Sequence, residues 1–318
     1  VKSNKAIPFY KKGFFCIKLR KKVEKINKLK TVFAIDPGSK RNGYTVANEK
    51  GVILNIQSNT NNWTKKNIEN RKNHRRNRRY RKTPYRKCRP NRNSKNNVPP
   101  STKARWDCHI RLLDVISQII PIDLVVIEDI KAVTKKNCRK WNKNFSPLEV
   151  GKKYFEQEIK NRNLEFESFE GWKTYWQRCN RNFTKNSNKL KEDWNTHCVD
   201  SHCLVELILG DMEPNKNMYI LNFLQFHRRE LHQGCKNGKR KKYGSTRSLG
   251  FNRGTLVKHP KYGLTYVGGC NETRISLHDL NGERLARNIK VEDCKILTKQ
   301  SWRTTFLPGM NAGVPCRK

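Results

Sequence analysis

Residues 75–79 (RRNRR) form a block of arginines inside a basic stretch from Trp63 to Lys82 that otherwise favours a helix and precedes Pro84. A helix with charge on every face cannot bury itself against an apolar core. The ordinary interpretation of a charge run is a solvated face or a disordered arm. Phosphate groups on several sides explain an arginine block of this density better, so we predict a helix that contacts nucleic acid and lies outside the core.

The charge of the whole chain points to the same class of partner. The sequence has 69 Lys and Arg residues against 27 Asp and Glu, a net charge of +42 at pH 7. Such an excess disfavours a compact chain through self-repulsion, which a phosphate backbone relieves. A membrane would require a span of about 20 apolar residues or a basic helix with a strong apolar face. The sequence shows neither pattern, and we expect no membrane partner.

The eleven cysteines are scattered singly, and no C-x-x-C pair occurs. Without paired spacing or a secretory signal, we expect free thiols in a reducing compartment, either the bacterial cytoplasm or the stroma of an organelle, and no secretion. The seven tryptophans and ten tyrosines could stack on bases, but we expect most of them to be core or hairpin packing.

Apolar periodicity predicts a mixed α/β fold. Residues 31–58 indicate three short strands, residues 104–120 a helix, and residues 123–130 a strand buried on both faces. A further helix is expected after Pro147, and residues 196–205 indicate the start of an amphipathic helix.

The C-terminal part differs in character. Short β-type segments recur at residues 255–257, 264–267, 274–277 and 294–297, and Asn281-Gly282 is a hairpin signal. We expect a small, barrel-like β domain there.

Carboxylates follow two of the predicted strands and lie within one helix. Asp36 ends the first strand, Glu128 ends the strand at 123–130, and Asp200 follows His197 by three residues on the later helix. In an RNase H fold the first and fourth strands pair in parallel at the centre of the sheet, so their ends lie side by side. Three such carboxylates would bind two Mg²⁺ ions, with Mn²⁺ as a substitute, that activate water and stabilise the leaving oxygen of a phosphodiester. His197 shares a helix face with Asp200 and would orient the water or stabilise the phosphate.

Each piece alone has another interpretation. D-x-G-S after an apolar strand also opens the phosphate loop of actin-like ATPases, and a lone strand-ending Glu is more often structural than catalytic. Two other classes stay open: an RNase H-fold nuclease that acts without a guide, as a resolvase or transposase would, and a nucleic-acid-binding protein without catalysis. The ATPase interpretation leaves the arginine block unexplained.

Seven segments together resemble the RuvC-like nucleases of the IscB/IsrB family, which are transposon-encoded and RNA-guided. They are residues 35–39 (IDPGS), 75–79 (RRNRR), 126–130 (VIEDI), 146–151 (SPLEVG), 197–201 (HCVDS), 243–251 (YGSTRSLGF) and 254–258 (GTLVK).

The resemblance implies an RNase H-like (RuvC) mixed sheet split by an arginine-rich bridge helix and followed by a small C-terminal β-rich domain. Larger family members insert an HNH nuclease, which needs histidines, between the second and third RuvC motifs. Residues 129–196 contain no histidine. This points to the IsrB type, a monomer in a ribonucleoprotein that binds a guide RNA (omega RNA) and double-stranded DNA with a displaced strand. With one nuclease centre it would nick one strand, the one not paired to the guide.

The implied organisation has eight parts. They are a basic N-terminal segment (1–30), RuvC part I (31–62), the bridge helix (63–90), RuvC part II (91–130), a basic connecting region (131–195), RuvC part III (196–225), a basic linker (226–252) and a target-interaction domain (253–318).

Basic residues of the bridge helix and the linker are the predicted nucleic-acid contacts. They are Arg71, Arg75, Arg76, Arg78, Arg79, Arg81, Arg86, Arg228, Arg229, Arg240, Lys241 and Lys242.

Overall fold

The computed structural model describes residues 4–11, 14–21, 29–61, 63–80, 98–129, 149–224, 249–270 and 273–309. The chain divides into two compact units. The first, here called the β unit, consists of Val1–Lys28 and Leu221–Thr305. The second, here called the sheet unit, consists of Leu29–Ile220 and Phe306–Lys318.

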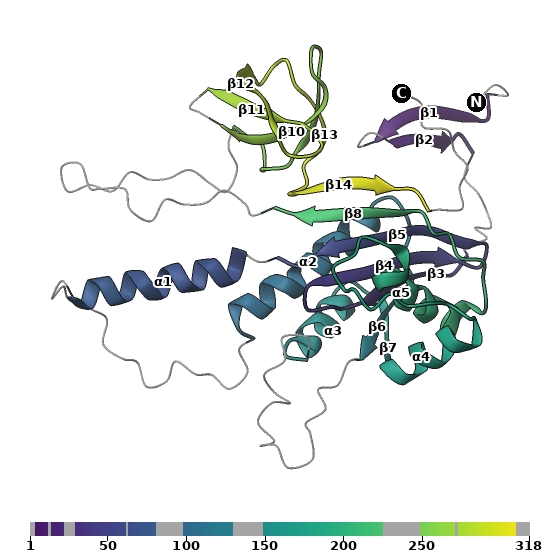
Figure 1. The fold of residues 1–318 in the computed structure, drawn as a ribbon. Helices are drawn as coiled ribbons and strands as arrows, with labels where there is room; N and C mark the ends of the chain where they lie inside the picture. The colour runs from purple at the N-terminus through teal and green to yellow at the C-terminus, as the bar shows by residue number, and fades with distance from the viewer. Residues whose placement is uncertain are drawn as a thin grey trace. The chain divides into compact units, whose positions relative to one another are not determined.

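The sheet unit is built on β3 (Thr31–Asp36), β4 (Arg41–Asn48), β5 (Gly51–Asn59), β6 (Leu124–Asp129) and β7 (Glu165–Glu170), in the order β5-β4-β3-β6-β7 (Figure 1). The strands β3, β4 and β5 are antiparallel neighbours, whereas β6 pairs in parallel with β3 and β7 in parallel with β6. The predicted mixed α/β fold with a mixed sheet is therefore confirmed. Its first and fourth strands pair in parallel at the centre, as the RNase H layout requires.

Apolar side chains cover both faces of this sheet. On one face Val32 and Val126 belong to a fully buried cluster with Leu204 of α5 (Trp194–Leu209). The other face contacts α2 (Pro100–Ile116), where Tyr44 of β4 packs on His109 at a ring-centroid distance of 5.5 Å. Alternate residues of a strand point to opposite faces, so a strand covered on both sides must be apolar throughout. This explains the uninterrupted apolar runs in β3 and β6.

The bounds of α2 differ from the predicted 104–120. The helix begins at Pro100, since the fixed φ of proline and its missing N–H suit the first helical turn. It ends at Ile116, and Ser117 donates its N–H to the Leu113 carbonyl oxygen. The residue before Pro121 is disfavoured in helical geometry, so the periodicity at 117–120 did not extend the helix.

Three strands of the sheet and one helix were not predicted, and one expected helix lies later than its signal. The helix expected after Pro147 is α3 (Lys152–Lys160). The missed elements are β7, α4 (Gly171–Asn180), β8 (Met218–Phe223) and β14 (Trp302–Leu307). In the hydrogen-bonded strand order, β8 follows β5 and β14 follows β8.

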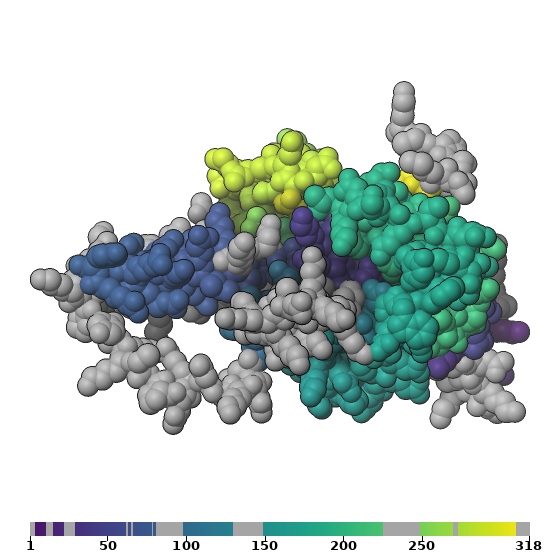
Figure 2. Space-filling view, turned by 60° about the horizontal axis from the view of Figure 1, so that its bottom comes forward, coloured from purple at the N-terminus to yellow at the C-terminus, as the bar shows by residue number. Residues whose placement is uncertain are grey.

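The arginine block lies on α1 (Trp63–Tyr80), which carries eight Lys and Arg residues and one acid, Glu69. From Arg71 to Tyr80, the only described side chain that is even partly buried is His74. Figure 2 shows the surface of α1, in blue, open to solvent on the side in view. The helix is therefore confirmed, and the part that bears the arginines buries almost nothing within the described chain.

The β unit contains an antiparallel hairpin of β1 (Ala6–Lys11) and β2 (Phe14–Leu19), which the sequence did not predict. Its second sheet has the order β12-β11-β10-β9-β13 around a core that includes Val257 and Leu277.

The strands of that sheet are β9 (Leu256–His259), β10 (Gly263–Cys270), β11 (Arg274–His278), β12 (Arg284–Lys290) and β13 (Lys295–Thr298). The four predicted C-terminal strands are thus present. The predicted Asn281-Gly282 turn joins β11 to β12, and β12 is a strand that was not predicted from the sequence. Among the described residues, no helix is long and apolar enough to span a membrane.

Candidate active site

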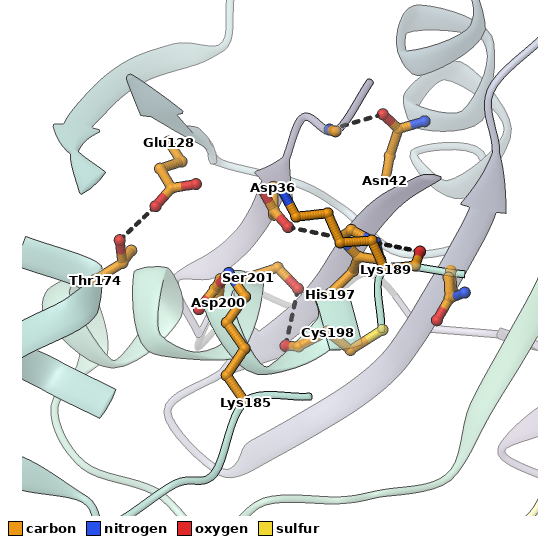
Figure 3. Close-up of polar contacts among 12 residues, drawn as sticks. Asp36, Asn42, Glu128, Thr174, Lys185, Lys189, His197, Cys198, Asp200 and Ser201 are labelled. Atoms are coloured by element: carbon orange, nitrogen blue, oxygen red, sulfur yellow. Dashed lines mark hydrogen bonds and ion pairs between the residues drawn. The ribbon is translucent and has the colours of Figure 1, made fainter. Parts of the chain in front are cut away.

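Three buried carboxylates meet at the ends of β3 and β6, as Figure 3 shows. The parallel register pairs Ile35 with Ile127, so Asp36 and Glu128 follow at adjacent strand ends. The helix α5 crosses below them and contributes Asp200. One oxygen from each of the three carboxylates lies within 4.8 Å of the others, and this is a group of ligands that could hold a metal ion. The structure thus brings together the three residues that the sequence predicted as ligands.

Close packing of α5 on the sheet depends on Gly43 of β4. A Cβ atom at this position would lie 2.3 Å from the His197 carbonyl oxygen and 2.5 Å from its carbon. Both are backbone atoms of α5, which cannot rotate away. The helix therefore approaches the strand closely enough to place His197 and Asp200 beside Asp36 only because residue 43 has no side chain.

We expect Gly43→Ala to destabilise the protein by about 1–3 kcal/mol, the usual cost of overpacking, and to lower metal affinity by displacing α5. Urea unfolding and calorimetric titration with Mg²⁺ measure the two effects. Gly269→Ala is the matched control, because its nearest heavy atom outside the adjoining residues is 4.0 Å away. Equal stability of the two variants would contradict the packing explanation.

Asp36 is held by the imidazole of His197. The two groups are 3.1 Å apart, from Nδ1 to Oδ2, and both side chains are buried. The other ring nitrogen, Nε2, lies 3.3 Å from the Lys189 carbonyl oxygen. Both ring nitrogens thus face oxygen atoms, which fixes the orientation of the ring. The predicted catalytic helper therefore contacts a candidate metal ligand directly and orients it.

Glu128 accepts a hydrogen bond of 2.5 Å from the Thr174 hydroxyl of α4. Burial, and after it the charge of Asp36, raises the pKa of Glu128 to about 8, although the Thr174 bond opposes the shift. The carboxylate is thus crowded by another negative charge in a dry site. A bound cation would relieve that crowding.

Asp200 is fully buried and forms ion pairs with two basic residues. Arg178 of α4 contacts its Oδ1 and Lys185 contacts its Oδ2. Burial, followed by Asp36, still raises the pKa of Asp200 above its ordinary value. Two cationic side chains therefore lie at the acid cluster, and sequence reasoning named neither of them, because no motif marks their positions.

A second buried network fixes α4 against α5. Glu206 of α5 accepts hydrogen bonds from Arg181 Nε at 3.1 Å and from Gln177 Nε2 at 3.1 Å. Arg181 also donates to the Met212 carbonyl oxygen at 2.9 Å. These contacts hold the helix that carries Thr174 and Arg178 in place.

The pKa of Glu128 makes stability depend on pH. Because the folded-state value of about 8 exceeds the ordinary value of 4.5, its contribution is complete below about pH 4.5 and is lost as the pH rises through 8. Glu128→Gln imitates the neutral form. In EDTA we expect the variant to match the wild type at pH 4.5 and to exceed it at pH 9, by on the order of a few kcal/mol.

Urea unfolding across this pH range measures the difference, with Glu167→Gln, an exposed residue of β7, as the control. At pH 9, Mg²⁺ is expected to stabilise the wild type more than the variant, because the ion needs the charged carboxylate. A stability difference that does not change with pH would show that Glu128 titrates normally.

The predicted nucleic-acid contacts divide into two groups. Arg71, Arg75, Arg76 and Arg79 lie exposed on α1. The side chain of Arg78 lies outside the described residues, as do Arg81, Arg86, Arg228, Arg229, Arg240, Lys241 and Lys242.

Comparison with known proteins gives one family match. Residues 1–142, fewer than half of the 318, match a family described as "RRXRR protein". This range includes Asp36, Glu128 and the arginine block. No curated protein matches the chain. Among solved structures, the chain is similar to "T. thermophilus RuvC in complex with Holliday junction substrate", with 10% identity and a TM-score of 0.31, over 55% of this chain and 89% of that one.

Proposed function

We propose that this protein is a divalent-metal-dependent DNA endonuclease that is guided by RNA and cuts one strand of its target. The observation that carries the proposal is the convergence of Asp36, Glu128 and Asp200 within 4.8 Å at the ends of two parallel strands. Carboxylates so close together repel one another, and burial increases the cost. A hydrolytic metal centre explains why the fold keeps all three.

The donor set fits Mg²⁺, which prefers hard oxygen ligands and keeps several waters, and Mn²⁺ would serve as a substitute. Asp36, Glu128 and Asp200 would hold two ions, which supply an activated water and stabilise the leaving oxygen of the phosphodiester. The raised pKa of Glu128 has the same origin, because burial and the charge of Asp36 disfavour its ionised form, and a bound cation would offset both.

The other residues of the site position these ligands and neutralise charge. His197 orients the Asp36 carboxylate, and the Thr174 hydroxyl fixes one oxygen of Glu128. Arg178 and Lys185 point at Asp200. In a site where Asp200 held a cation, their charged ends would be the nearest cationic groups to offer the non-bridging oxygens of the scissile phosphate.

RNA guidance is supported by α1 and by the family match. The exposed arginines of α1 lack an acidic partner on their own helix apart from Glu69, and like charges spaced i, i+4 destabilise a helix. The family described as "RRXRR protein" matches residues 1–142, which include the arginine block of α1. We propose that α1 lies along a guide RNA and that the C-terminal β-rich domain contacts target DNA, so that base pairing supplies the sequence specificity.

The proposal that only one strand is cut is supported by the absence of histidine from residues 129–196, the connecting region. An HNH centre there would need histidine. We therefore propose a single RuvC-type centre that acts on the strand not paired to the guide.

The test is to purify the chain with its bound nucleic acid, sequence any RNA of discrete length, and incubate the complex with supercoiled plasmid and Mg²⁺. We expect a discrete RNA and a nicked, relaxed plasmid. Nicking by RNA-free protein would favour the guide-independent resolvase-like or transposase-like nuclease. RNA binding without cleavage would leave a nucleic-acid-binding protein.

A further inference from the structure

The two sides of α4 have different chemistry. Its inner side contacts the acid site, because Thr174 is buried and binds Glu128 while Arg178 binds Asp200. At its first residue, a Cβ atom on Gly171 would lie 3.2 Å from the Glu128 carboxylate. The helix therefore lines the proposed active site along its length.

Its outer side carries three large aromatic residues that are more than half exposed. Trp172 is 55% exposed, Tyr175 53% and Trp176 59%. The spacings of three and four residues place Tyr175 and Trp176 beside Trp172 on the helix surface. Trp172 and Trp176 are the exposed tryptophans of the described chain, whereas Trp106, Trp194 and Trp302 are buried. We call the three outer residues of α4 the aromatic face.

Cations and a hydrogen bond accompany the aromatic face. The Trp172 indole N–H donates to the Glu170 carboxylate at 2.7 Å, which fixes the orientation of the ring. The Lys173 ammonium lies 5.7 Å from the Trp172 ring centroid. The Arg178 guanidinium, which pairs with Asp200 on the inner side, also lies 5.5 Å from the Tyr175 ring centroid. Exposed rings with positive charges beside them match the two parts of a nucleotide, a flat base and a phosphate.

We propose that the aromatic face of α4 is a base-stacking platform that holds an unpaired DNA strand at the acid site. The inference rests on the proposed nuclease function and deepens it by assigning the residues that bind the unpaired strand beside the acid site. In a duplex, neighbouring base pairs cover the faces of each base, so only an unpaired strand offers bases to Trp172 and Trp176.

The dimensions agree with this arrangement. A helix with its side chains is about 10–12 Å across, and bases along one strand are about 3.4 Å apart. A strand whose bases stack on the outer side of α4 must pass around half the helix circumference, about 16–19 Å, and so reaches the inner side within roughly five to six nucleotides. A protein partner for the aromatic face is less suited to this chain, whose net charge of +42 favours a polyanion.

Stacking can be separated from charge by its salt dependence, because release of counterions depends on salt and stacking does not. The probe is a fluorescent oligothymidine of about 15 nucleotides, with a hairpin duplex for comparison, titrated with the full chain in EDTA at several salt concentrations. We expect the Trp172→Ala/Trp176→Ala variant to bind the oligothymidine roughly tenfold or more weakly at every salt concentration. The slope of log K against log salt should not change.

Three comparisons make the test specific. Lys173→Ala should instead reduce the slope by about 0.7. Tyr10→Ala/Phe15→Ala, which removes another exposed aromatic pair, 5.6 Å apart in the β1–β2 hairpin, should leave oligothymidine binding unchanged. Duplex binding by the tryptophan variant should stay within about twofold, and quenching of tryptophan fluorescence by the oligothymidine should be lost. Far-UV circular dichroism checks that the variant is folded.

Unchanged oligothymidine affinity in the tryptophan variant would overturn the proposal, as would equal losses for single strand and duplex. The proposal would also be overturned if the tryptophan variant kept its DNA affinity but lost concentration-dependent self-association. The aromatic face would then bind a second copy of this chain. The assay contains no metal and needs no cleavage. If the tryptophan variant loses oligothymidine affinity but the wild-type protein does not nick plasmid, only the proposed nuclease function is contradicted. If the wild-type protein nicks plasmid but the tryptophan variant binds oligothymidine normally, only the proposed base-stacking platform is contradicted.

Discussion

Asp36→Ala is expected to lower the rate of plasmid nicking by on the order of 10³-fold or more, the scale seen when one member of a catalytic unit is removed. Asp36 is 4% exposed, ends the central strand β3 and is held by His197, and its loss removes one of the three clustered carboxylates. Asp36→Asn should be nearly as inactive, because an amide is a far weaker ligand for Mg²⁺ than a carboxylate. Gel assays of supercoiled plasmid give the rates.

The same substitution should leave nucleic-acid binding intact, since Asp36 is buried and bears a negative charge. Asp293→Asn, at an exposed position in the β unit, is the matched control and should nick at the wild-type rate. Loss of binding together with cleavage would indicate misfolding, and thermal unfolding of Asp36→Asn tests for that. A variant that is folded, binds normally and still nicks would remove Asp36 from the catalytic centre.

Neutralising the exposed arginines of α1 is expected to have the second large effect. Replacing Arg71, Arg75, Arg76 and Arg79 by Gln should weaken RNA binding by on the order of 10²-fold or more at physiological salt. If all four contact phosphates, the slope of log K against log salt should fall by about 3, because each contact releases about 0.7 counterions from a single strand and about 0.9 from a duplex. Glutamine keeps the helix propensity.

Four exposed lysines outside α1 provide a control with the same change in net charge. They are Lys50, Lys103, Lys153 and Lys160. Their replacement by Gln should change RNA affinity much less than the α1 variant does. If both variants lose the same affinity and the same slope, then RNA responds to overall charge, and α1 is not a specific binding element.

The local part of this structure could be predicted because its signals are local. The apolar runs of β3 and β6 and their terminal carboxylates are adjacent in sequence, and a parallel pairing of the two strands is enough to bring Asp36 beside Glu128. Asp200 could be added because the apolar face of α5 must pack on the same sheet.

The rest depends on contacts that leave no pattern in the sequence. The strand β7 (EFESFE) is rich in glutamate and lies at the edge of the sheet, so it lacks the apolar run that marked β6. Arg178 and Lys185 look like any other basic residue in a chain that has 69 of them, and only the fold shows that they contact Asp200. The exposed aromatic residues on the outer side of α4 could not be predicted either, because the sequence alone does not distinguish an exposed tryptophan from a buried one.

The most direct test of RNA-guided cleavage by this acid site is to exchange the targeting part of the bound RNA for a new sequence. The reconstituted complex is then incubated with two plasmids, of which only one contains that sequence. We expect Mg²⁺-dependent nicking of the matching plasmid, on one strand and at one position, and none of it with Asp36→Ala. Nicking of both plasmids at equal rates, or at positions that do not follow the new sequence, would contradict the account.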